Sequence, residues 1–373
     1  MQVTHFLNSI RPEHDGVTRV ADHLRAGFLK APQSSSHQFI ASVLPDPIPN
    51  DMRRVPSIPF PLSTGYRFPV WYKRVVLSAL QNQKNPILHI HTPCPLGLTA
   101  ARLAEKRKLP CVATYHTHFP TYLKYYKITA LRSWVWRYLK HLYRSCDHLI
   151  VPSQATLEEL KNEGFSRLIH IPHGVDTHLY SPSQRKNSWR KKVGGENRVI
   201  VTFVGRLVWE KNLKLLPEIA QRVSHPHQVQ WVVVGDGPAR AQLEKLLPQA
   251  YFTGFLGSTE LPTAYASSDV FIFPSVTETF GNVTVEAMAS GLPALCVAAG
   301  GARDLIIPGE NGFLLDPNDP LEFAKAIDLL VSKPDLRAQL SEGALRRSAR
   351  YSWKSTVEQY LSVYESLLRD QRK

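Results

Sequence analysis

Residues 271–295 read FIFPSVTETFGNVTVEAMASGLPAL, an apolar run followed by a polar turn and a helical segment. We expect the apolar run to form a buried strand and the helix to begin near Gly281. Short β-rich apolar runs alternate with helical segments in the same way along most of the chain. This alternation predicts the α/β class, in which parallel sheets are joined by crossover helices.

The chain has 373 residues, too many for one ordinary core, so we expect two domains. Residues 181–198 turn polar, basic and glycine-containing, which is typical of a domain boundary. We therefore predict two doubly wound, Rossmann-like domains, over residues 1–185 and 186–352, whose ligands bind at the carboxyl ends of the strands. Seven prolines within residues 45–69 exclude a long helix or a central strand there, so we expect a surface loop.

The composition is that of a globular protein, with 43% hydrophobic and 20% charged residues. No apolar run approaches the roughly 20 residues that a membrane-spanning helix needs. The first residues, MQVTHFL, have the pattern of a buried strand and lack the features of a secretory signal. We therefore expect a cytoplasmic protein, peripheral at the inner membrane face. The four cysteines form no CxxC pair and fit reduced core thiols.

The positive charge is concentrated in the first half of the chain. Residues 1–189 hold 24 Lys and Arg against 11 Asp and Glu, whereas the remaining residues hold 21 against 20. A net charge of +13 against +1 indicates that the first half faces an anionic partner, such as a membrane surface, a nucleic acid or an acidic substrate. A basic, solvated surface without a partner is the alternative.

Two carboxylates, Glu278 and Glu286, lie eight residues apart across the turn between the apolar strand and its helix. Backbone N–H groups at Phe280, Gly281 and Asn282, together with the helix dipole, are suited to bind a phosphate or a sugar oxygen. Glu286 is then within reach of a ribose diol, and Glu278 of sugar hydroxyls. Taken singly, the two carboxylates would fit a first-turn helix residue and a solvent-facing one. Paired carboxylates also serve glycoside hydrolases, but the amides favour a nucleotide substrate.

Two further strand ends carry chemistry in the second half. In VTFVGRLVWEKN, residues 201–212, Gly205 ends a strand, and the cations Arg206 and Lys211 follow it. Such cations stabilise a departing diphosphate, although each alone would pass for an ordinary strand-end or helix residue. In VVVGDGPARAQL, residues 232–243, Gly235 opens a turn that lacks the third glycine of a dinucleotide fingerprint. The missing glycine disfavours binding of a nicotinamide cofactor, and we interpret this turn as a wall of the nucleotide pocket.

The first half offers a glycine turn and a histidine at comparable places. Gly16 lies between the first strand and its helix, where amides can approach a diphosphate. His116 follows a buried strand and enters an aromatic loop, so we expect it to contact substrate. The pairs His89 with His91 and His116 with His118 suggest a metal site, but no carboxylate or CxxC completes a ligand set. No DxD triplet occurs either, so we expect no metal.

Residues 128–145, ITALRSWVWRYLKHLYRS, predict a helix in which aromatic and basic residues alternate. Trp134, Trp136, Tyr138 and Tyr143 lie among arginines and a lysine, a composition that suits anionic lipid headgroups. A helix that packs its aromatic side chains inward is the alternative reading of the same pattern.

Together these segments resemble the family four retaining glycosyltransferases of the GT-B fold, over almost the whole chain. Four motifs of that family find a match: E-x7-E in Glu278 and Glu286, G-R-x4-K in Gly205, Arg206 and Lys211, the Gly loop in Gly16, and the cleft histidine in His116. The loop reads His14-Asp15-Gly16 where several members of the family have paired glycines. HTHFPTYLKYY and ETFGN look like the branch that glycosylates membrane lipids.

The resemblance implies two Rossmann-like domains that face each other across a cleft, with a last helix near 353–370 crossing back onto the first domain. It implies transfer of a hexose from a nucleotide-sugar, first of all GDP-mannose or UDP-glucose, to a hydroxyl of a glycolipid or phospholipid. Configuration would be retained, with no metal or other cofactor. Arg206 and Lys211 would stabilise the leaving diphosphate, while Glu278, Glu286 and His116 would bind the sugar and the ribose.

Two other functions remain open at this stage. A nucleotide-sugar epimerase can share the two-domain fold and would bind the same donors. A nucleic-acid-binding protein is suggested by the basic first half alone, and it explains none of the motifs in the second half. We therefore expect no nucleic-acid partner.

Overall fold

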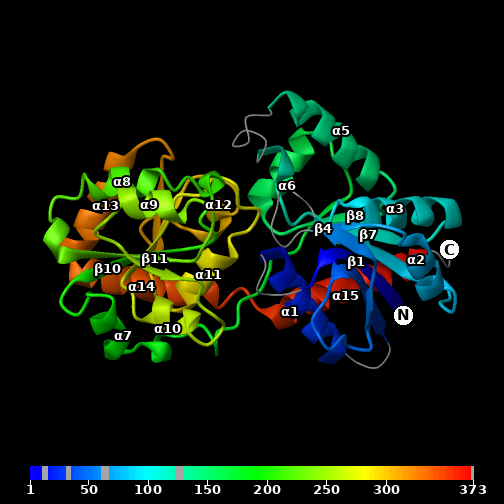
Figure 1. Ribbon diagram of the computed structural model, residues 1–373, viewed down its shortest axis with the longest axis horizontal. Coiled ribbons are helices and arrows are strands. Elements are labelled where there is room, and N and C mark those ends of the chain that lie inside the picture. Colours follow the sequence, from blue (N-terminus) through cyan, green and yellow to red (C-terminus); the bar gives the residue numbers. More distant parts are fainter. Residues whose placement is uncertain (11–15, 31–34, 60–66, 122–128, 371–373) are drawn as a thin grey trace. The chain divides into compact units, whose positions relative to one another are not determined.

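The computed structural model describes residues 1–10, 16–30, 35–59, 67–121 and 129–370, and these form two compact units (Figure 1). Unit 1 consists of Met1–His173 and Trp353–Lys373, and unit 2 of Gly174–Ser352. Each unit contains a parallel sheet covered by helices, so the α/β class predicted from the alternating pattern is confirmed.

The sheet of unit 1 has seven strands in the order β3-β2-β1-β6-β7-β8-β9. The chain starts in the middle with β1, continues to one edge, and then returns to the other side of β1. This reversal makes β1 and β6 a switch point. The strands are β1 Gln2–Ser9, β2 Ser36–Val43, β3 Met52–Arg54, β6 Ile87–Ile90, β7 Cys111–Thr114, β8 His148–Val151 and β9 Leu168–His170.

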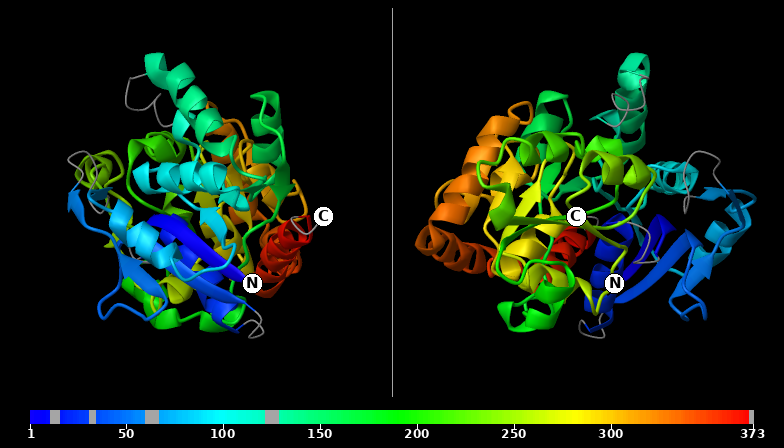
Figure 2. Two further views of the ribbon diagram at one scale, coloured as in Figure 1. Left: turned by 90° about the vertical axis from the view of Figure 1, so that its right-hand side faces the viewer. Right: turned by 60° about the vertical axis from the view of Figure 1, so that its left-hand side comes forward.

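Two apolar layers cover the two faces of this sheet. Successive residues of a strand point to opposite faces, so Phe6 packs in one layer and Leu7 in the other. The layer around Phe6 includes residues of α2 (Lys73–Leu80), α3 (Pro95–Arg107) and α5 (Arg132–Tyr143). The layer around Leu7 includes residues of α1 (Gly16–Lys30) and of the last helix, α15 (Trp353–Asp370), which lie side by side (Figures 1 and 2). The last helix thus packs on unit 1.

The proline-rich stretch 45–69 is more regular than the expected surface loop. β3 contains no proline and pairs with β2 at the edge of the large sheet. β4 (Ser57–Pro59) and β5 (Arg67–Pro69) form a separate antiparallel pair, while residues 60–66 lie outside the described residues. Proline at the ends of such short edge strands removes no hydrogen bond from a sheet interior, which explains why the stretch tolerates it.

Unit 2 contains a six-stranded parallel sheet in the order β12-β11-β10-β13-β14-β15. The strands are β10 Val199–Val204, β11 Val229–Val234, β12 Tyr251–Gly254, β13 Val270–Phe273, β14 Ala294–Val297 and β15 Gly312–Leu315. The helices are α7 Asn187–Lys192, α8 Leu215–Ala220, α9 Arg240–Leu246, α10 Leu261–Ala266, α11 Asn282–Ala289, α12 Ala302–Leu305, α13 Pro320–Ser332 and α14 Pro334–Ser348. β10 lies between β11 and β13, so the switch point of this sheet falls between β10 and β13.

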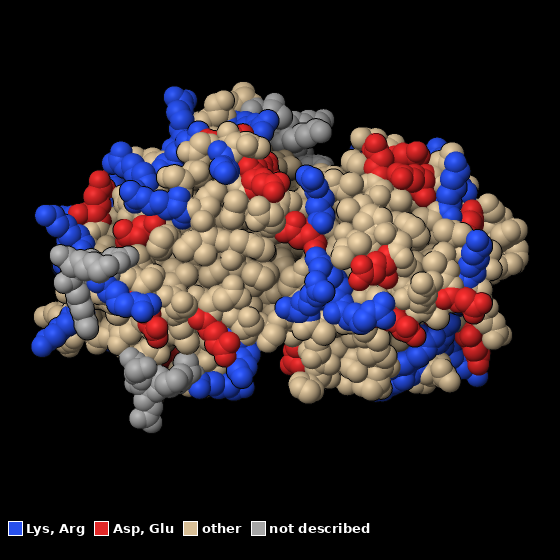
Figure 3. Space-filling view, turned by 180° about the vertical axis from the view of Figure 1, so that it is seen from behind, with Lys and Arg blue, Asp and Glu red and all other residues tan. Residues whose placement is uncertain are grey.

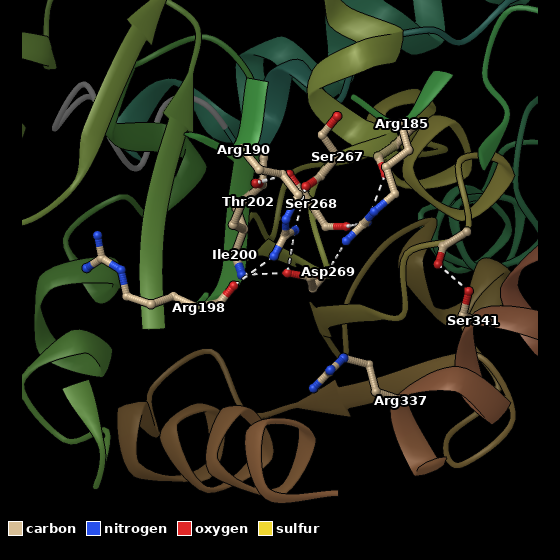
Figure 4. A network of polar contacts seen from close by, with 12 residues as sticks. Arg185, Arg190, Arg198, Ile200, Thr202, Ser267, Ser268, Asp269, Arg337 and Ser341 are labelled. Atoms are coloured by element: carbon tan, nitrogen blue, oxygen red, sulfur yellow. Dashed lines mark hydrogen bonds and ion pairs between the residues drawn. The ribbon is translucent and has the colours of Figure 1, made fainter. Parts of the chain in front are cut away.

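The division between the units falls before the predicted boundary at 185/186, because residues 174–185 pack on unit 2. Tyr180 belongs to the core of unit 2. Asp269 accepts hydrogen bonds from Arg185, at 3.0 Å, and from Arg190 and the backbone of Ile200, each at 2.8 Å (Figure 4). This carboxylate therefore links the segment that contains Arg185 and Arg190 to β10. The polar sequence of this segment had suggested a domain boundary.

The charge follows the structural units. Unit 1 holds 26 Lys and Arg against 13 Asp and Glu, and unit 2 holds 19 against 18. On the face that Figure 3 shows, blue basic side chains predominate over unit 1, at the left, and are mixed with red acidic ones over unit 2. Among the described residues, no helix is long and apolar enough to cross a membrane.

Candidate functional site

The switch point of unit 2 brings together charged side chains from two neighbouring strand ends. Lys211 ends a short 3-10 helix (Trp209–Lys211) that follows β10, and Glu278 lies in the turn after β13. Lys211 Nζ donates to Glu278 Oε1, which also accepts from Ser275 Oγ at 2.9 Å. The side chains of Lys211 and Glu278 are 16% and 18% exposed, so the pair is accessible from solvent. The structure thus joins two residues that the sequence placed in separate motifs.

The helix after this turn begins as the sequence predicts. α11 starts at Asn282, and Gly281 precedes it as its N-cap with φ 102°, a left-handed conformation that favours glycine. Amides of the first helical turn lie before the intrahelical hydrogen bonds begin, so the helix start is suited to bind an anion. The neighbouring loop fits closely: Gly301 N donates to Glu278 O at 2.9 Å, and Phe280 is buried beneath it.

Glu286 lies in the interior of unit 2. The residue is 5% exposed, and its Oε2 accepts a hydrogen bond from Tyr265 of α10 at 3.2 Å. The alternative reading of Glu286 as a solvent-facing helix residue is therefore wrong. A buried carboxylate is costly unless it is hydrogen-bonded, so this contact accounts for part of its stability at that position.

The strand ends of β10 and β11 approach each other through glycine. A Cβ atom on Gly235 would lie 1.9 Å from Gly205 O, and its φ of 129° also favours glycine. The turn after Gly235 is held by Asp236, whose Oδ1 accepts from Gly237 N at 2.7 Å. Arg206 leaves this junction as an exposed side chain. Gly205, Arg206 and Gly235 therefore lie at one edge of the sheet with Glu278.

In unit 1, His116 lies two residues after β7 and is 8% exposed. Its Nε2 is 3.0 Å from His91 Nδ1. Burial lowers the pKa of His116 well below its ordinary value, with smaller contributions from His91 and His173, so the ring is neutral near pH 7. Gly16, the predicted glycine of the first turn, begins α1, and residues 11–15 before it lie outside the described residues.

The structure adds two histidines that sequence reasoning missed, His5 and His37. His5 pairs in register with His89 on the neighbouring strand, and ring nitrogens of His5, His89 and His91 lie within 4.8 Å of one another. The available signal was a histidine in the apolar strand MQVTHFL, which had no obvious reason to be there. The two HxH pairs do not form one group: His118 instead contacts Glu159 at 2.9 Å.

The predicted interfacial helix is only partly as expected. Residue 128 lies outside the described residues, and α5 covers Arg132–Tyr143. Trp136 and Tyr143 are buried in the core, and Tyr138 is half-buried, with its hydroxyl donating to Pro93 O at 2.9 Å. Only Trp134 among the four aromatic side chains is exposed, so the inward-packing alternative holds for the other three. The buried face is apolar because it packs in the core layer around Phe6, where α5 contacts α3.

Both units match known families. Residues 14–179 match the family described as "Glycosyltransferase Family 4", and residues 185–347 match "Glycosyl transferases group 1". A "GDP-mannose-dependent alpha-mannosyltransferase" of Mycobacterium tuberculosis is 34% identical over 369 residues, 97% of this chain and 94% of the relative. One of the same name from Corynebacterium glutamicum is 31% identical, over 99% and 89%. An "Alpha-monoglucosyldiacylglycerol synthase" of Acholeplasma laidlawii is 24% identical, over 99% and 98%.

Solved structures share the fold. Sucrose-phosphate synthase from Thermosynechococcus elongatus has a TM-score of 0.82 at 20% identity, covering 99% of this chain and 100% of the other. Anabaena Alr3699/HepE in complex with UDP-glucose has a TM-score of 0.79 at 22% identity, covering 98% and 100%. The predicted GT-B fold is thereby confirmed. With both units matched and relatives above 30% identity along nearly its whole length, the chain belongs to the family 4, group 1 glycosyltransferases and is a nucleotide-sugar-dependent hexosyltransferase.

Proposed function

We propose that this enzyme transfers mannose from GDP-mannose to a hydroxyl of a membrane lipid or lipid-linked glycan, with retention of configuration and without a metal ion or other cofactor. The observation that carries the proposal is the Lys211–Glu278 pair at the switch point of unit 2. The choice of GDP-mannose follows relatives of that name with 31–34% identity over nearly the whole chain. UDP-glucose is the competing donor.

The cations of this site would act on the leaving group. Departure of the nucleoside diphosphate concentrates negative charge on its oxygens, and Arg206 and Lys211 would stabilise that charge in the transition state. Glu278 holds the Lys211 ammonium in place before the donor arrives, which reduces the entropy lost on reaching the reactive geometry. The amides of Phe280, Gly281 and Asn282 would bind phosphate oxygens at the start of α11.

The carboxylates and His116 would bind the sugars. We assign Glu278 to a hydroxyl of the transferred hexose and Glu286 to the ribose diol, since charged acceptors hydrogen-bond hydroxyls strongly. Glu286 is already oriented by Tyr265. Gly205 and Gly235 would let the backbone approach the nucleotide, and Gly16 and His116 would contribute contacts from unit 1.

The acceptor side of the proposal concerns unit 1. Its net charge of +13 favours anionic surfaces, and α5 exposes Arg137, Lys140 and Trp134, of which Trp134 is 57% exposed. An exposed tryptophan among cations suits the headgroup region of a bilayer. We propose that unit 1 docks on the anionic inner face of the membrane through this helix and selects a lipid acceptor there.

Donor and acceptor can be tested in one assay. The protein is incubated with GDP-mannose or UDP-glucose, with and without vesicles that contain phosphatidylinositol or diacylglycerol, and the glycolipid product is measured. We expect a mannolipid from GDP-mannose that requires the vesicles. Turnover of UDP-glucose alone would refute the donor, and an epimerised nucleotide-sugar formed without any acceptor would indicate an epimerase. Thermal stabilisation by each nucleotide-sugar reports donor binding separately from transfer.

A further inference from the structure

Four buried histidines of unit 1 form a continuous row of hydrogen-bonded rings that ends at His116. His37 Nδ1 lies 3.0 Å from His5 Nε2, and His5 Nδ1 lies 3.0 Å from His91 Nε2. His91 Nδ1 in turn lies 3.0 Å from His116 Nε2. We call these four residues the histidine chain. In every link an Nδ1 atom meets an Nε2 atom, so the rings all point the same way along the chain.

The parallel sheet creates this row. His37 lies on β2, His5 on the adjacent β1, His91 directly after β6, and His116 beyond the end of β7. The row thus crosses the sheet towards the carboxyl ends of its strands. None of the four residues is more than 9% exposed. Phe28 of α1 stacks on His37, with ring centroids 4.3 Å apart, and helps to shield that end of the row from water.

Burial keeps all four rings neutral near pH 7. It lowers the pKa of His37 to about 4 and that of His91 to about 3. For His5 and His116 burial is again the largest cause and lowers the pKa well below the ordinary value. Neighbouring histidines add to the effect, because a second positive charge nearby would be unfavourable.

Neutral rings in such a row can arrange their protons in only two ways. Each neutral imidazole has one N–H and one unprotonated nitrogen, and each link needs one proton between its two nitrogens. A proton on His37 Nδ1 therefore requires one on Nδ1 of every following ring. A proton on His37 Nε2 requires Nε2 in every ring. In the first arrangement His116 carries an N–H at Nδ1, and in the second it carries a lone pair there.

We propose that the histidine chain couples the tautomer of His116 to those of His37, His5 and His91, which act as positioning residues. The proposal rests on the assignment of His116 to the donor sugar made above. In a neutral ring, the hydrogen bond at one nitrogen decides whether the other nitrogen carries the proton. His116 can then change the kind of hydrogen bond that it offers a sugar hydroxyl only if all four rings change together, so a proton shift at His116 alone is disfavoured.

His89 provides a matched control inside the same cluster. Its ring stacks on His91 with centroids 3.9 Å apart, and burial also lowers its pKa well below the ordinary value. However, its Nδ1 bonds Tyr364 Oη at 2.6 Å and its Nε2 bonds Thr114 Oγ1 at 2.8 Å. His89 is therefore a buried, neutral and stacked histidine that is not a member of the chain.

A metal ion is the competing use of these rings. One ring nitrogen each from His5, His89 and His91 could reach a common ion, and three histidines are a donor set that zinc accepts. Both nitrogens of each of these rings already have a hydrogen-bond partner. An ion would have to displace part of this network, and we therefore favour the hydrogen-bonded chain.

The tautomers can be read directly. In protein with 15N-labelled histidine rings, long-range proton–nitrogen correlations distinguish the two neutral tautomers and the charged ring, and single variants assign the signals. We expect the same tautomer in all four chain residues near pH 7. Mixed tautomers or a charged ring within the chain would overturn the proposal. So would one equivalent of Zn2+ that survives a chelator, because a metal-bound nitrogen carries no proton.

Activity tests the function of the chain. In the parent protein the ring centroids of His5 and Phe39 lie 4.3 Å apart. His5→Phe keeps an aromatic ring that can stack there, but it removes the hydrogen bonds to His37 and His91. We expect kcat for mannose transfer to fall roughly 10-fold to 100-fold, as when a reacting group is misplaced. His89→Phe should stay near the parent kcat. At the other end of the chain, His37→Phe should lower kcat in the same way. His37→Asn should restore kcat, because the side-chain amide can take the place of His37 Nδ1 in the hydrogen bond to His5. These two variants provide the test if His5→Phe does not fold.

The outcomes separate this proposal from the proposed function. Full activity of His5→Phe and His37→Phe together with loss of activity in His116→Ala would refute the chain and leave the role of His116 intact. Full activity of His116→Ala would refute that role, whatever the tautomers are. A loss of activity in His89→Phe equal to that in His5→Phe would show a general effect of the buried cluster and would also overturn the proposal.

Discussion

Units 1 and 2 both contain a parallel sheet with a reversal of strand order, but the ionisable side chains near the two switch points differ in charge and in exposure to solvent. At the switch point of unit 2, Lys211 and Glu278 form an ion pair whose side chains are 16% and 18% exposed. Near the switch point of unit 1, His5 and His91 are at most 2% exposed and have pKa values lowered by burial. Water access accounts for the difference, because a charge without solvent or a partner is costly.

This comparison suggests a division of labour. The Lys211–Glu278 pair keeps a charged ammonium at the switch point of unit 2, where it can stabilise an anionic diphosphate when the donor arrives. A buried, neutral row of rings cannot take up charge cheaply, and it is suited to holding one arrangement of protons. Unit 2 would therefore supply charge to the reaction, and unit 1 would supply fixed hydrogen bonds.

The largest effect should appear when the protein is acidified. Each buried histidine has a folded-state pKa below the unfolded value of about 6.5, so the unfolded chain binds more protons as the pH falls. Stability should be complete above pH 6.5 and decrease below it by about 1.4 kcal/mol per pH unit for each such histidine. Hydrogen exchange at pH 7 and pH 5 should show unit 1 losing protection before unit 2. Equal loss in both units would contradict the comparison.

Removing the cation of unit 2 should reduce transfer. Lys211→Ala takes away the charge that stabilises the leaving diphosphate, so we expect kcat to fall on the order of 100-fold or more. Initial rates of GDP release measure the effect. Lys245→Ala, which removes an exposed lysine of α9, is the matched control and should turn over normally. Near-normal turnover of Lys211→Ala would sink the assignment of the diphosphate site.

The junction of β10 and β11 should be sensitive to a single methyl group. Gly235→Ala would place a Cβ 1.9 Å from Gly205 O at a φ of 129°, so the free energy of unfolding of unit 2 should fall by about 2 to 3 kcal/mol. Hydrogen exchange of the β10 and β11 amides, measured at increasing denaturant concentration, reports this unit. Gly257→Ala, where the added atom meets nothing within 4 Å, should change stability little. Equal destabilisation by the two substitutions would show that the close approach of Gly235 to Gly205 O does not determine the stability of this junction.

The smallest effect concerns the surface of unit 1. Arg137→Gln and Lys140→Gln remove two exposed cations from α5 and should each weaken binding to anionic vesicles by about 1 kcal/mol, or about five-fold. Co-sedimentation with anionic and neutral vesicles at low and high salt measures the loss. Arg222→Gln and Lys245→Gln on unit 2 are the controls. Binding that is equal for both vesicle types would remove the electrostatic part of the membrane proposal.

The sequence by itself determined what depends on local order. Strand, turn and helix follow one another within residues 271–295, so the fold class, the helix start at Gly281 and the spacing of Glu278 and Glu286 could be predicted. The orientation of the aromatic side chains in residues 128–145 was harder to predict, because alternating Trp and Arg are compatible with aromatic side chains that point into the core or out to the surface. Only tertiary packing decided that Trp136, which contacts His118 and Phe165, is buried and that Trp134 is exposed.

The tertiary structure alone decided which distant residues meet. The Lys211–Glu278 pair joins residues 67 apart because β10 and β13 are neighbours in the sheet. His5 and His91 meet across 86 residues because β1 pairs with β6. Strand order is set by how the whole set of strands and helices buries its apolar surface, and no single segment of sequence carries that information. The motifs therefore identified the chemistry, and the sheet decided which groups act together.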